Sequence, residues 1–261
     1  MNRISLQMYT LRNVTTDMTG LENALRKLRK IGFETIQFSI PQNFDAKAVK
    51  KLFDAYKMKN DSVFCPFLSL EERESEMLEQ CELFDTKYVR VDSIPTQLVS
   101  PAGFKMFAHY LNEVGEGYKK QGKKLIYHFH AFEFINFGKE TGLSILLRET
   151  DPEIVTFQPD THWIQAGGCD PADYIKSISD RVSYVHVKDY AIGQRGPLLE
   201  STPSRFAVIG EGNLDWPKII TACKSFDCPL YVIEQDDTYG EDPFACVKRS
   251  YDALVGLGCN D

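Results

Sequence analysis

The sequence lacks close cysteine pairs, although it contains seven cysteines, at positions 65, 81, 169, 223, 228, 246 and 259. An odd number of scattered cysteines argues against a disulfide framework and against a zinc-ribbon site. We therefore expect the cysteines to be reduced and the protein to be cytoplasmic.

Long apolar runs and an excess of positive charge are also missing. No run approaches the roughly 18 apolar residues of a membrane-spanning helix, and MNRISLQMYTLRN at 1–13 has no signal-peptide core. The formal net charge is −7, from 30 basic and 37 acidic residues, whereas a protein that binds the nucleic-acid backbone should show a basic balance or stripe. We expect neither a membrane nor a nucleic acid as a partner.

Histidine is scarce, with five residues in 261, yet two of them lie two positions apart in YHFHAFEF at 127–134. Residues i and i+2 of a strand point to the same face, so His128 and His130 would share a face, with Glu133 close behind. Hydrogen-bonded histidines in a polar patch and a functional site are both compatible with this segment alone.

Short β-branched or aromatic runs alternate with amphipathic stretches along the whole chain. The predicted strands cover residues 4–10, 34–40, 61–67, 87–93, 124–130, 154–160, 182–188 and 230–236, and the predicted helices cover 21–31, 46–56, 70–84, 102–121, 143–149, 171–179, 216–226 and 243–254. Eight such units in 261 residues predict an α/β fold, a (β/α)₈ TIM barrel, in a single domain spanning 1–261. An open doubly wound sheet is the alternative, but no glycine-rich phosphate loop follows the first strand.

Polar and apolar residues alternate in these strands, and the polar ones cluster late in each strand. Since the apolar set must pack on the helices, the polar set faces inward, at the carboxyl ends where barrel active sites form. The residues expected to converge there are His128, His130, Asp160, His186 and Glu234, with His162 just beyond.

Imidazoles and carboxylates from several strands suit a divalent metal ion such as Mn²⁺, Mg²⁺, Co²⁺ or Zn²⁺. With coordination positions left for a substrate carbonyl and hydroxyl, the ion would stabilise an enediolate while a neighbouring group removes the α-proton. Ion pairs lining the barrel mouth without a metal are the alternative. The sequence has no nucleophile elbow, Walker loop or HExxH motif, and nothing marks a particular serine.

The segment from Tyr190 to Gly212 is long for a loop between a strand and a helix, and such loops over barrel mouths are often lids. It ends in the sequence Gly-Glu-Gly, which is compatible with a tight turn before a helix or with a substrate contact through Glu211.

Six segments resemble the sugar-phosphate isomerase/epimerase-like proteins of the xylose isomerase-like barrel superfamily, which also contains inosose dehydratases, ketose 3-epimerases and endonuclease IV. They are LQMYTLRN at 6–13, YHFHAFEF at 127–134, FQPDTHWIQAGGCDP at 157–171, VHVKDY at 185–190, IGEGNLDW at 209–216 and VIEQDD at 232–237. The resemblance runs nearly end to end and concerns fold and superfamily more than substrate.

In the epimerase branch of that superfamily, Glu, Asp, His and Glu hold the metal, and the two glutamates move the proton. The resemblance therefore implies Asp160, His186 and Glu234 as ligands, with Glu234 also as the base. His128 stands where the first glutamate would be, so either His128 fills that ligand position or Glu133 reaches back to it. His130 and Lys188 are then the candidates for moving protons or contacting substrate.

The resemblance implies a metal-dependent isomerase or epimerase acting on a keto sugar, polyol ketone or sugar phosphate. A lyase such as an inosose dehydratase shares the enediolate, and an endonuclease IV-like enzyme or a non-catalytic binding barrel are further alternatives. The substrate-binding candidates are Gln7, Tyr9, Arg12, Arg90, His162 and Glu211, with Arg12 as a ligand for a phosphate or carboxylate. The expected partner is a small carbohydrate, and a homodimer is compatible with the barrel class.

Overall fold

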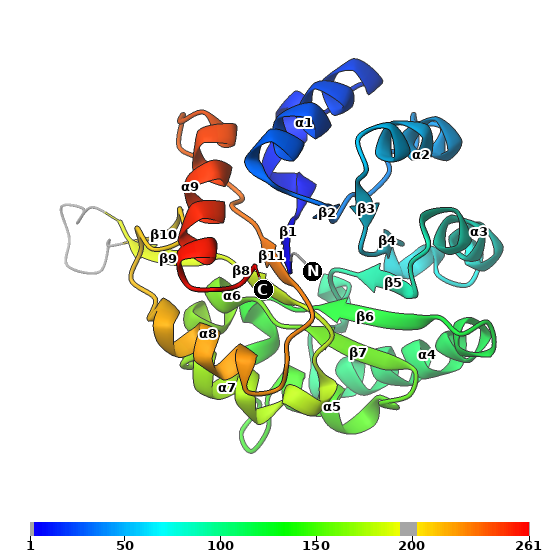
Figure 1. Cartoon of the computed structure of the whole chain (residues 1–261). Coiled ribbons are helices and arrows are strands. Elements are labelled where there is room, and N and C mark those ends of the chain that lie inside the picture. Colours follow the sequence, from blue (N-terminus) through cyan, green and yellow to red (C-terminus); the bar gives the residue numbers. More distant parts are fainter. Residues whose placement is uncertain (1–2, 194–202, 261) are drawn as a thin grey trace.

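The computed structural model describes residues 3–193 and 203–260, and within them a ring of parallel strands is surrounded by helices (Figure 1). The strands of the ring are β1 (Ile4–Leu6), β2 (Thr35–Ile36), β3 (Lys59–Asn60), β4 (Val63–Phe64), β5 (Tyr88–Val91), β6 (Lys124–His128), β7 (Val155–Gln158), β8 (Val185–Val187) and β11 (Tyr231–Ile233). Since β3 and β4 occupy one place in the wall, the described residues supply eight strand positions.

The ring closes on itself. Strand β1 pairs in parallel with β11, which pairs in parallel with β8, and β4 to β7 form a continuous parallel sheet. Strand β2 pairs in parallel with β3. Isolated bridges join β1 to β2 through Gln7 and Gln37, and β7 to β8 through two pairs, Phe157 with Val182 and Asp160 with His186. Closure confirms the predicted (β/α)₈ barrel and excludes the open sheet.

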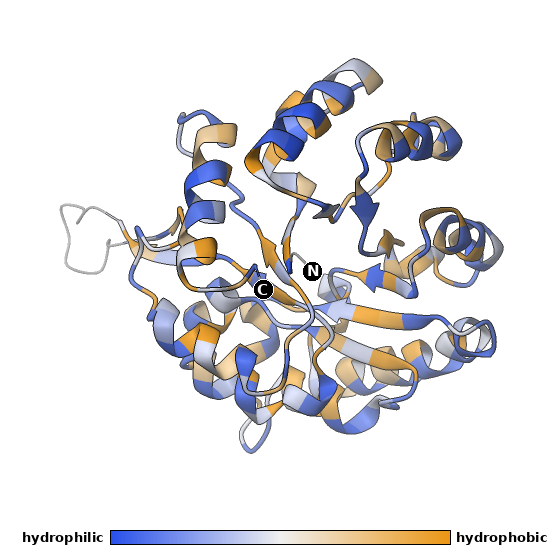
Figure 2. Cartoon of the chain, in the orientation of Figure 1, coloured by the Kyte–Doolittle hydropathy of each residue, from blue (hydrophilic) through white to orange (hydrophobic). Residues whose placement is uncertain are grey.

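Amphipathic helices form the outer layer. They are α1 (Met18–Ile31), α2 (Ala46–Ala55), α3 (Glu74–Phe84), α4 (Pro101–Lys120), α5 (Gly142–Glu149), α6 (Thr161–Ala166), α7 (Pro171–Ser177), α8 (Trp216–Lys224) and α9 (Pro243–Gly256). In α1 the buried positions Leu21, Ala24, Leu25 and Leu28 follow the helical period, so one stripe packs on the strands. Figure 2 shows largely hydrophobic strands β6, β7 and β11, and outer helices of mixed character. No helix in the described ranges is long and apolar enough to cross a membrane.

Several elements start where the sequence predicts. The Ser100 hydroxyl accepts a hydrogen bond from Gly103 N at the start of α4, and the Asp242 carboxylate accepts one from Phe244 N at the start of α9. Each cap precedes a proline at the first position of the helix. Proline has no backbone N–H, and the N–H at this position would have no partner within the helix.

The strands are shorter than predicted, and their last residues belong to loops. After Leu6 the chain turns into the 3₁₀ helix η1 (Met8–Val14), so the first strand does not reach residue 10. Helix α6 begins directly after Asp160 and was not predicted, because six residues are too few to show a helical period. Most of the polar residues expected on strands therefore lie at strand ends or one or two residues beyond them, whereas His186 lies within β8 and Arg90 within β5.

The long segment after β8 begins and ends as a two-stranded antiparallel hairpin, β9 (Asp189–Ile192) with β10 (Ser204–Ala207). Its middle, residues 194–202, lies outside the described residues, so the predicted lid function stays a prediction.

Candidate active site

Four side chains from four consecutive wall positions meet inside the carboxyl end of the barrel. His128, Asp160, His186 and Glu234 are all buried, and one potential ligand atom of each lies within 4.8 Å of the others. We call these residues the four-residue cluster. The sequence predicted all four to converge.

Local structure orients the Asp160 carboxylate. Asp160 is the N-cap of α6, and its Oδ1 accepts a hydrogen bond from Trp163 N at 3.1 Å. Its Oδ2 is left to face the cluster, 3.4 Å from His128 Nε2 and 3.8 Å from His186 Nδ1. One carboxylate oxygen therefore caps α6, and the other points into the cluster.

The orientation of His186 is set by two buried residues, Gln37, which follows β2, and Asp61, which follows β3. His186 Nε2 lies 2.7 Å from Gln37 Oε1, and Gln37 Nε2 donates to Asp61 Oδ1 at 3.0 Å. Because the Asp61 carboxylate accepts the amide N–H, the Gln37 oxygen must be the atom that faces the imidazole, and it accepts the proton of Nε2. This arrangement leaves His186 Nδ1 as the free ring nitrogen that points into the cluster, as an outer hydrogen bond does for metal-binding histidines.

His186 Nδ1 and Glu234 Oε2 lie 3.0 Å apart. Within the described ranges, both are buried without a partner in hydrogen-bond geometry, although Lys188 Nζ approaches the same oxygen at 2.9 Å. Burial would lower the pKa of His186, but Glu234 and Asp160 outweigh it and raise that pKa. Two acceptors facing each other require a positive charge between them, either a proton or a metal ion, so a divalent ion fits this donor set.

Lys188 lies beside the cluster and is fully buried. Its Nζ is 3.2 Å from Asp160 Oδ2, 2.9 Å from Glu234 Oε2 and 3.2 Å from Asp236 Oδ2. Burial would lower the pKa of Lys188, but the three carboxylates outweigh it and raise that pKa. Lys188 is therefore protonated near neutral pH, so it can donate a proton or attract negative charge.

Two residues of the cluster, His128 and Glu234, line a cavity of about 280 Å³. The lining residues are Gln7, Tyr9, Ser39, Arg90, Asp92, His128, His130, Lys188, Glu234 and Asp236. Arg90 is paired with Asp92 at 2.6 Å and with Ser39 at 2.7 Å. As far as the described residues go, Arg90 Nη1 and His130 Nδ1 are buried and have no hydrogen-bond partner. Both residues line the cavity, so they are candidates for contacting substrate hydroxyls.

A family model for the xylose isomerase-like TIM barrel matches residues 25–249. The chain belongs to the xylose isomerase-like TIM barrel family. Curated relatives include an inosose dehydratase from Geobacillus kaustophilus, 31% identical over 166 residues that cover 59% of this chain and 51% of the relative. An inosose dehydratase from Clostridium perfringens is 25% identical over 263 residues, or 88% of each protein. The chain thus spans about half the length of the first relative and most of the second.

Solved structures of the xylose isomerase-like barrel agree with this fold. A sugar phosphate isomerase/epimerase from Parabacteroides distasonis has a TM-score of 0.82 and 20% identity, covering 100% of this chain and 96% of the other. L-ribulose 3-epimerase has a TM-score of 0.73 and 17% identity, covering 99% and 95%. At such identities the likeness establishes the fold alone.

Not every residue predicted to bind substrate lies in the cavity of this xylose isomerase-like barrel. Gln7, Tyr9 and Arg90 line it. Arg12 lies next to it, with its guanidinium donating to the backbone oxygens of Tyr9 and Asp236, both at 2.8 Å. Both acceptors are neutral, so the guanidinium keeps its positive charge, and its role in binding a phosphate or carboxylate stays a prediction.

The structure does not bring His162 or Glu211 to the cavity, as its described lining shows. His162 is buried among aromatic rings, with Nδ1 3.0 Å from the backbone oxygen of Asp189 and its ring stacked on Phe206. Glu211 is paired with Arg249 of α9 at 2.7 Å, so its carboxylate serves the outer surface. Both were predicted from sequence proximity to motifs, which does not determine side-chain direction.

The Gly-Glu-Gly turn has a structural role. The buried Asp189 carboxylate accepts hydrogen bonds from Gly210 N at 2.8 Å, Gly212 N at 3.1 Å and Trp216 Nε1 at 2.8 Å. A Cβ at residue 212 would lie 2.3 Å from Asp189 Oδ1, so only glycine fits there. Asp189 therefore fixes both ends of the segment that the sequence predicted to be a lid.

Glu133 was the alternative to His128, and the structure gives it other partners. It is fully buried, its Oε2 accepts a hydrogen bond from His130 N at 2.9 Å, and its Oε1 accepts one from the Tyr127 hydroxyl. It is absent from the four-residue cluster, as the described residues define it. Of the two candidates, His128 is the one that the structure places with the other three residues.

Replacing Glu133 by glutamine is expected to change the pH dependence of stability. Burial raises the pKa of Glu133 from 4.5 to about 7, so the folded state holds the proton more tightly than the unfolded state. The resulting stabilisation, about 3 kcal/mol, is fully present below pH 4.5 and is lost as pH rises through 7. In urea unfolding, the free energy of unfolding of the parent should fall between pH 5 and pH 8.5. In Glu133→Gln this fall should be smaller by roughly 2–3 kcal/mol.

Glu113→Gln, at an exposed position of α4, is the matched control. If the parent, Glu133→Gln and the control lose the same free energy of unfolding between the two pH values, Glu133 is not the group responsible.

The site residues predicted from the sequence did not include four polar residues that surround the site. Gln37 orients His186. Ser39 and Asp92 both hold Arg90, and Asp236 contacts Lys188. A signal existed for each: Gln37 and Ser39 alternate with Ile36 and Phe38, Asp92 follows Arg90 by two positions and Asp236 follows Glu234 by two.

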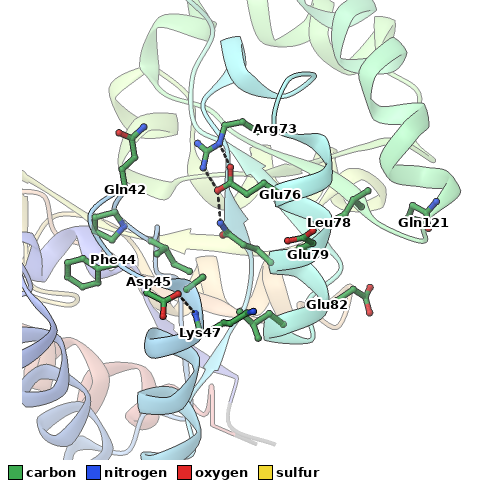
Figure 3. Close-up of a pocket in the computed structure, with 15 residues that line it drawn as sticks. Gln42, Phe44, Asp45, Lys47, Arg73, Glu76, Leu78, Glu79, Glu82 and Gln121 are labelled. Atoms are coloured by element: carbon green, nitrogen blue, oxygen red, sulfur yellow. Dashed lines mark hydrogen bonds and ion pairs between the residues drawn. The ribbon is translucent and has the colours of Figure 1, made fainter.

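A larger cavity of about 1050 Å³ lies outside the barrel wall, along α3 and the chain that enters α2 (Figure 3). Its polar walls include the exposed ion pair of Arg73 with Glu76 at 2.6 Å. Because it contains none of the four-residue cluster and no buried unpaired polar atom among its described lining residues, we assign the chemistry to the smaller cavity.

Proposed function

We propose that this protein is a metal-dependent isomerase or epimerase that removes the proton α to the carbonyl of an uncharged keto sugar or polyol ketone. The observation that carries this proposal is the pair of facing buried acceptors, His186 Nδ1 and Glu234 Oε2, in a four-residue cluster at the side of a polar cavity. Membership of a barrel family that includes proteins named as epimerases and dehydratases supports it.

Asp160, His186, Glu234 and His128 would hold a divalent ion, with Mn²⁺, Mg²⁺, Co²⁺ and Zn²⁺ all compatible with two imidazoles and two carboxylates. When bound, such an ion polarises a carbonyl oxygen and stabilises the negative charge that develops as the α-proton leaves.

The chain's own residues divide the proton transfer. Glu234 is ionised, because the charges of Lys188 and His186 overcome its burial and lower its pKa, so it is ready to accept the α-proton. Lys188 remains a cation beside the reacting atoms and stabilises negative charge there. Burial chiefly, and then His128, lowers the pKa of His130 to about 3, so a neutral imidazole lines the cavity as a candidate second carrier.

The cavity favours a small, uncharged substrate. Its volume of about 280 Å³ is at the lower end of small-molecule sites, which run from about 300 to 1,000 Å³. Each of its two cations, considering the described lining only, is already paired: Arg90 with Asp92 and Lys188 with three carboxylates. The carboxylates of the lining outnumber its two cations, so no excess positive charge is left for a phosphate, whereas uncharged hydroxyls need none.

Dehydration of a ketone is the second candidate, and two observations favour it. The curated relatives are named inosose dehydratases, and the protonated Lys188 is a positioned group for a departing hydroxyl. The two reactions share proton removal by Glu234 and differ in whether the intermediate is reprotonated or loses water.

The test is exchange of the α-proton with D₂O for a panel of ketoses and inososes, with Mn²⁺ added and with EDTA. We expect metal-dependent deuterium incorporation with the substrate's oxygen count unchanged, read by mass spectrometry. Loss of water, with an absorbing enone product, would instead establish the dehydratase. Exchange that is unaffected by EDTA would contradict the metal-dependent proposal.

A further inference from the structure

The ammonium of Lys188 draws on the same carboxylates as the proposed ion. Its Nζ lies 3.2 Å from Asp160 Oδ2 and 2.9 Å from Glu234 Oε2. These are the oxygens that face His128 and His186. A cation of the chain and a bound divalent ion would therefore share both acidic groups of the cluster.

Lys188 has a third carboxylate that lies outside the cluster. Both oxygens of Asp236 are 3.2 Å from its Nζ, and the Asp236 side chain is 21% exposed where those of Asp160 and Glu234 are 0% and 6%. On its other sides the ammonium faces the rings of Trp163 and Phe206, 5.3 and 5.5 Å from their centroids. Rings attract a cation more weakly than a carboxylate does, so Asp236 is the strongest alternative partner for Lys188.

We propose that Lys188 competes with the divalent ion for Asp160 and Glu234, and that Asp236 positions the ammonium so that the ion can bind. This inference rests on the proposed metal site and goes beyond it, because it assigns the ion affinity to two residues that do not ligate the ion. Like charges a few ångströms apart in a buried site repel strongly, so the net affinity must depend on where the ammonium is held.

The test is calorimetric titration of Mn²⁺ into four proteins: the parent, Lys188→Met, Asp236→Asn and the double variant. Removing the competing charge should tighten Mn²⁺ binding in Lys188→Met by about tenfold or more. Asp236→Asn should weaken it by about tenfold, because the ammonium then stays on Asp160 and Glu234.

The double variant separates positioning from a simple loss of negative charge near the ion. If Asp236 acts through Lys188, the double variant should bind Mn²⁺ as tightly as Lys188→Met. If Asp236→Asn weakens binding equally in both backgrounds, the positioning role is wrong. Unchanged or weaker binding in Lys188→Met overturns the competition.

Thermal unfolding in EDTA provides a second readout. Lys188→Met leaves Asp160 and Glu234 without their buried counter-charge, so its Tm should fall without ion and recover with saturating Mn²⁺. Lys218→Met removes an exposed, paired lysine of α8 and should change neither quantity. Should Lys188→Met fail to fold, the partly exposed Asp236→Asn still decides, since unchanged Mn²⁺ affinity there would overturn the proposal. If none of the proteins binds Mn²⁺, the proposed metal site itself is wrong, and this inference with it.

Discussion

Asp160→Asn is expected to weaken Mn²⁺ binding by about 100-fold or more, beyond the roughly 10–100-fold that loss of an outer hydrogen-bond partner costs a metal site. The Oδ2 oxygen of Asp160 faces His128, His186 and Lys188. In the variant, an amide NH₂ placed there would offer no lone pair to an ion and would meet the Lys188 ammonium as a second donor.

The variant should still fold, because its side-chain oxygen can keep the hydrogen bond that caps α6. Asp160 Oδ1 caps α6 by accepting from Trp163 N, and asparagine is as good an N-cap as aspartate. Calorimetry with Mn²⁺ and thermal unfolding in EDTA measure the two effects separately.

Asp170→Asn is the matched control, since Asp170 caps α7 through Asp173 N in the same way but is exposed and is not part of the cluster. It should leave Mn²⁺ affinity unchanged. Equal Mn²⁺ content in Asp160→Asn and the parent would contradict the assignment of Asp160 as a ligand.

The barrel and the convergence of the site could be predicted because both follow from periodicity. Alternation of His186 and Lys188 with Val185 and Val187 defines an inner face, and parallel strands bring their carboxyl ends to one mouth. That argument needs no knowledge of side-chain rotamers, which is why it correctly grouped Asp160, His186 and Glu234.

Residues in the loops after the strands were harder to predict, because a loop side chain has no fixed period. Glu133 and Glu211 are both glutamates a few residues past a strand or turn, yet one is buried against Tyr127 and the other is paired with Arg249. The hydrogen bond from His186 to Gln37 joins residues 149 positions apart. Pairings of that kind depend on the closed ring, and the local pattern does not contain them.

The departure at His128 has a consequence for catalysis. The resemblance implied two glutamates on opposite sides of the substrate, but the four-residue cluster contains one. Glu234 is then the glutamate of the cluster that can accept the α-proton, and the carrier on the other side must be a different group. His130 is our candidate for that role because it lines the cavity, although its pKa of about 3 makes the imidazole a weak base.

Glu234→Gln is therefore expected to lower α-proton exchange by about 10²–10⁴-fold, the usual contribution of a general base. Because Glu234 is also a proposed ligand, the exchange rate must be measured at saturating Mn²⁺, with the affinity measured separately by calorimetry. The glutamine keeps the size and one acceptor oxygen of the side chain but cannot take up a proton, so the rate should stay low even when the ion is bound.

Glu211→Gln makes the same chemical change at a glutamate paired with Arg249 on the outer surface, and it should exchange at the parent rate. His130→Gln distinguishes the two proton carriers: it should slow formation of the epimerised product more than it slows exchange, because Glu234 can still remove and return the proton on its own side. If Glu234→Gln exchanged the proton at the parent rate with Mn²⁺ bound, Glu234 would not be the base. Another group would then remove the α-proton, and the proposed epimerase and the dehydratase would both need a different base, because the cluster contains no other glutamate among the described residues.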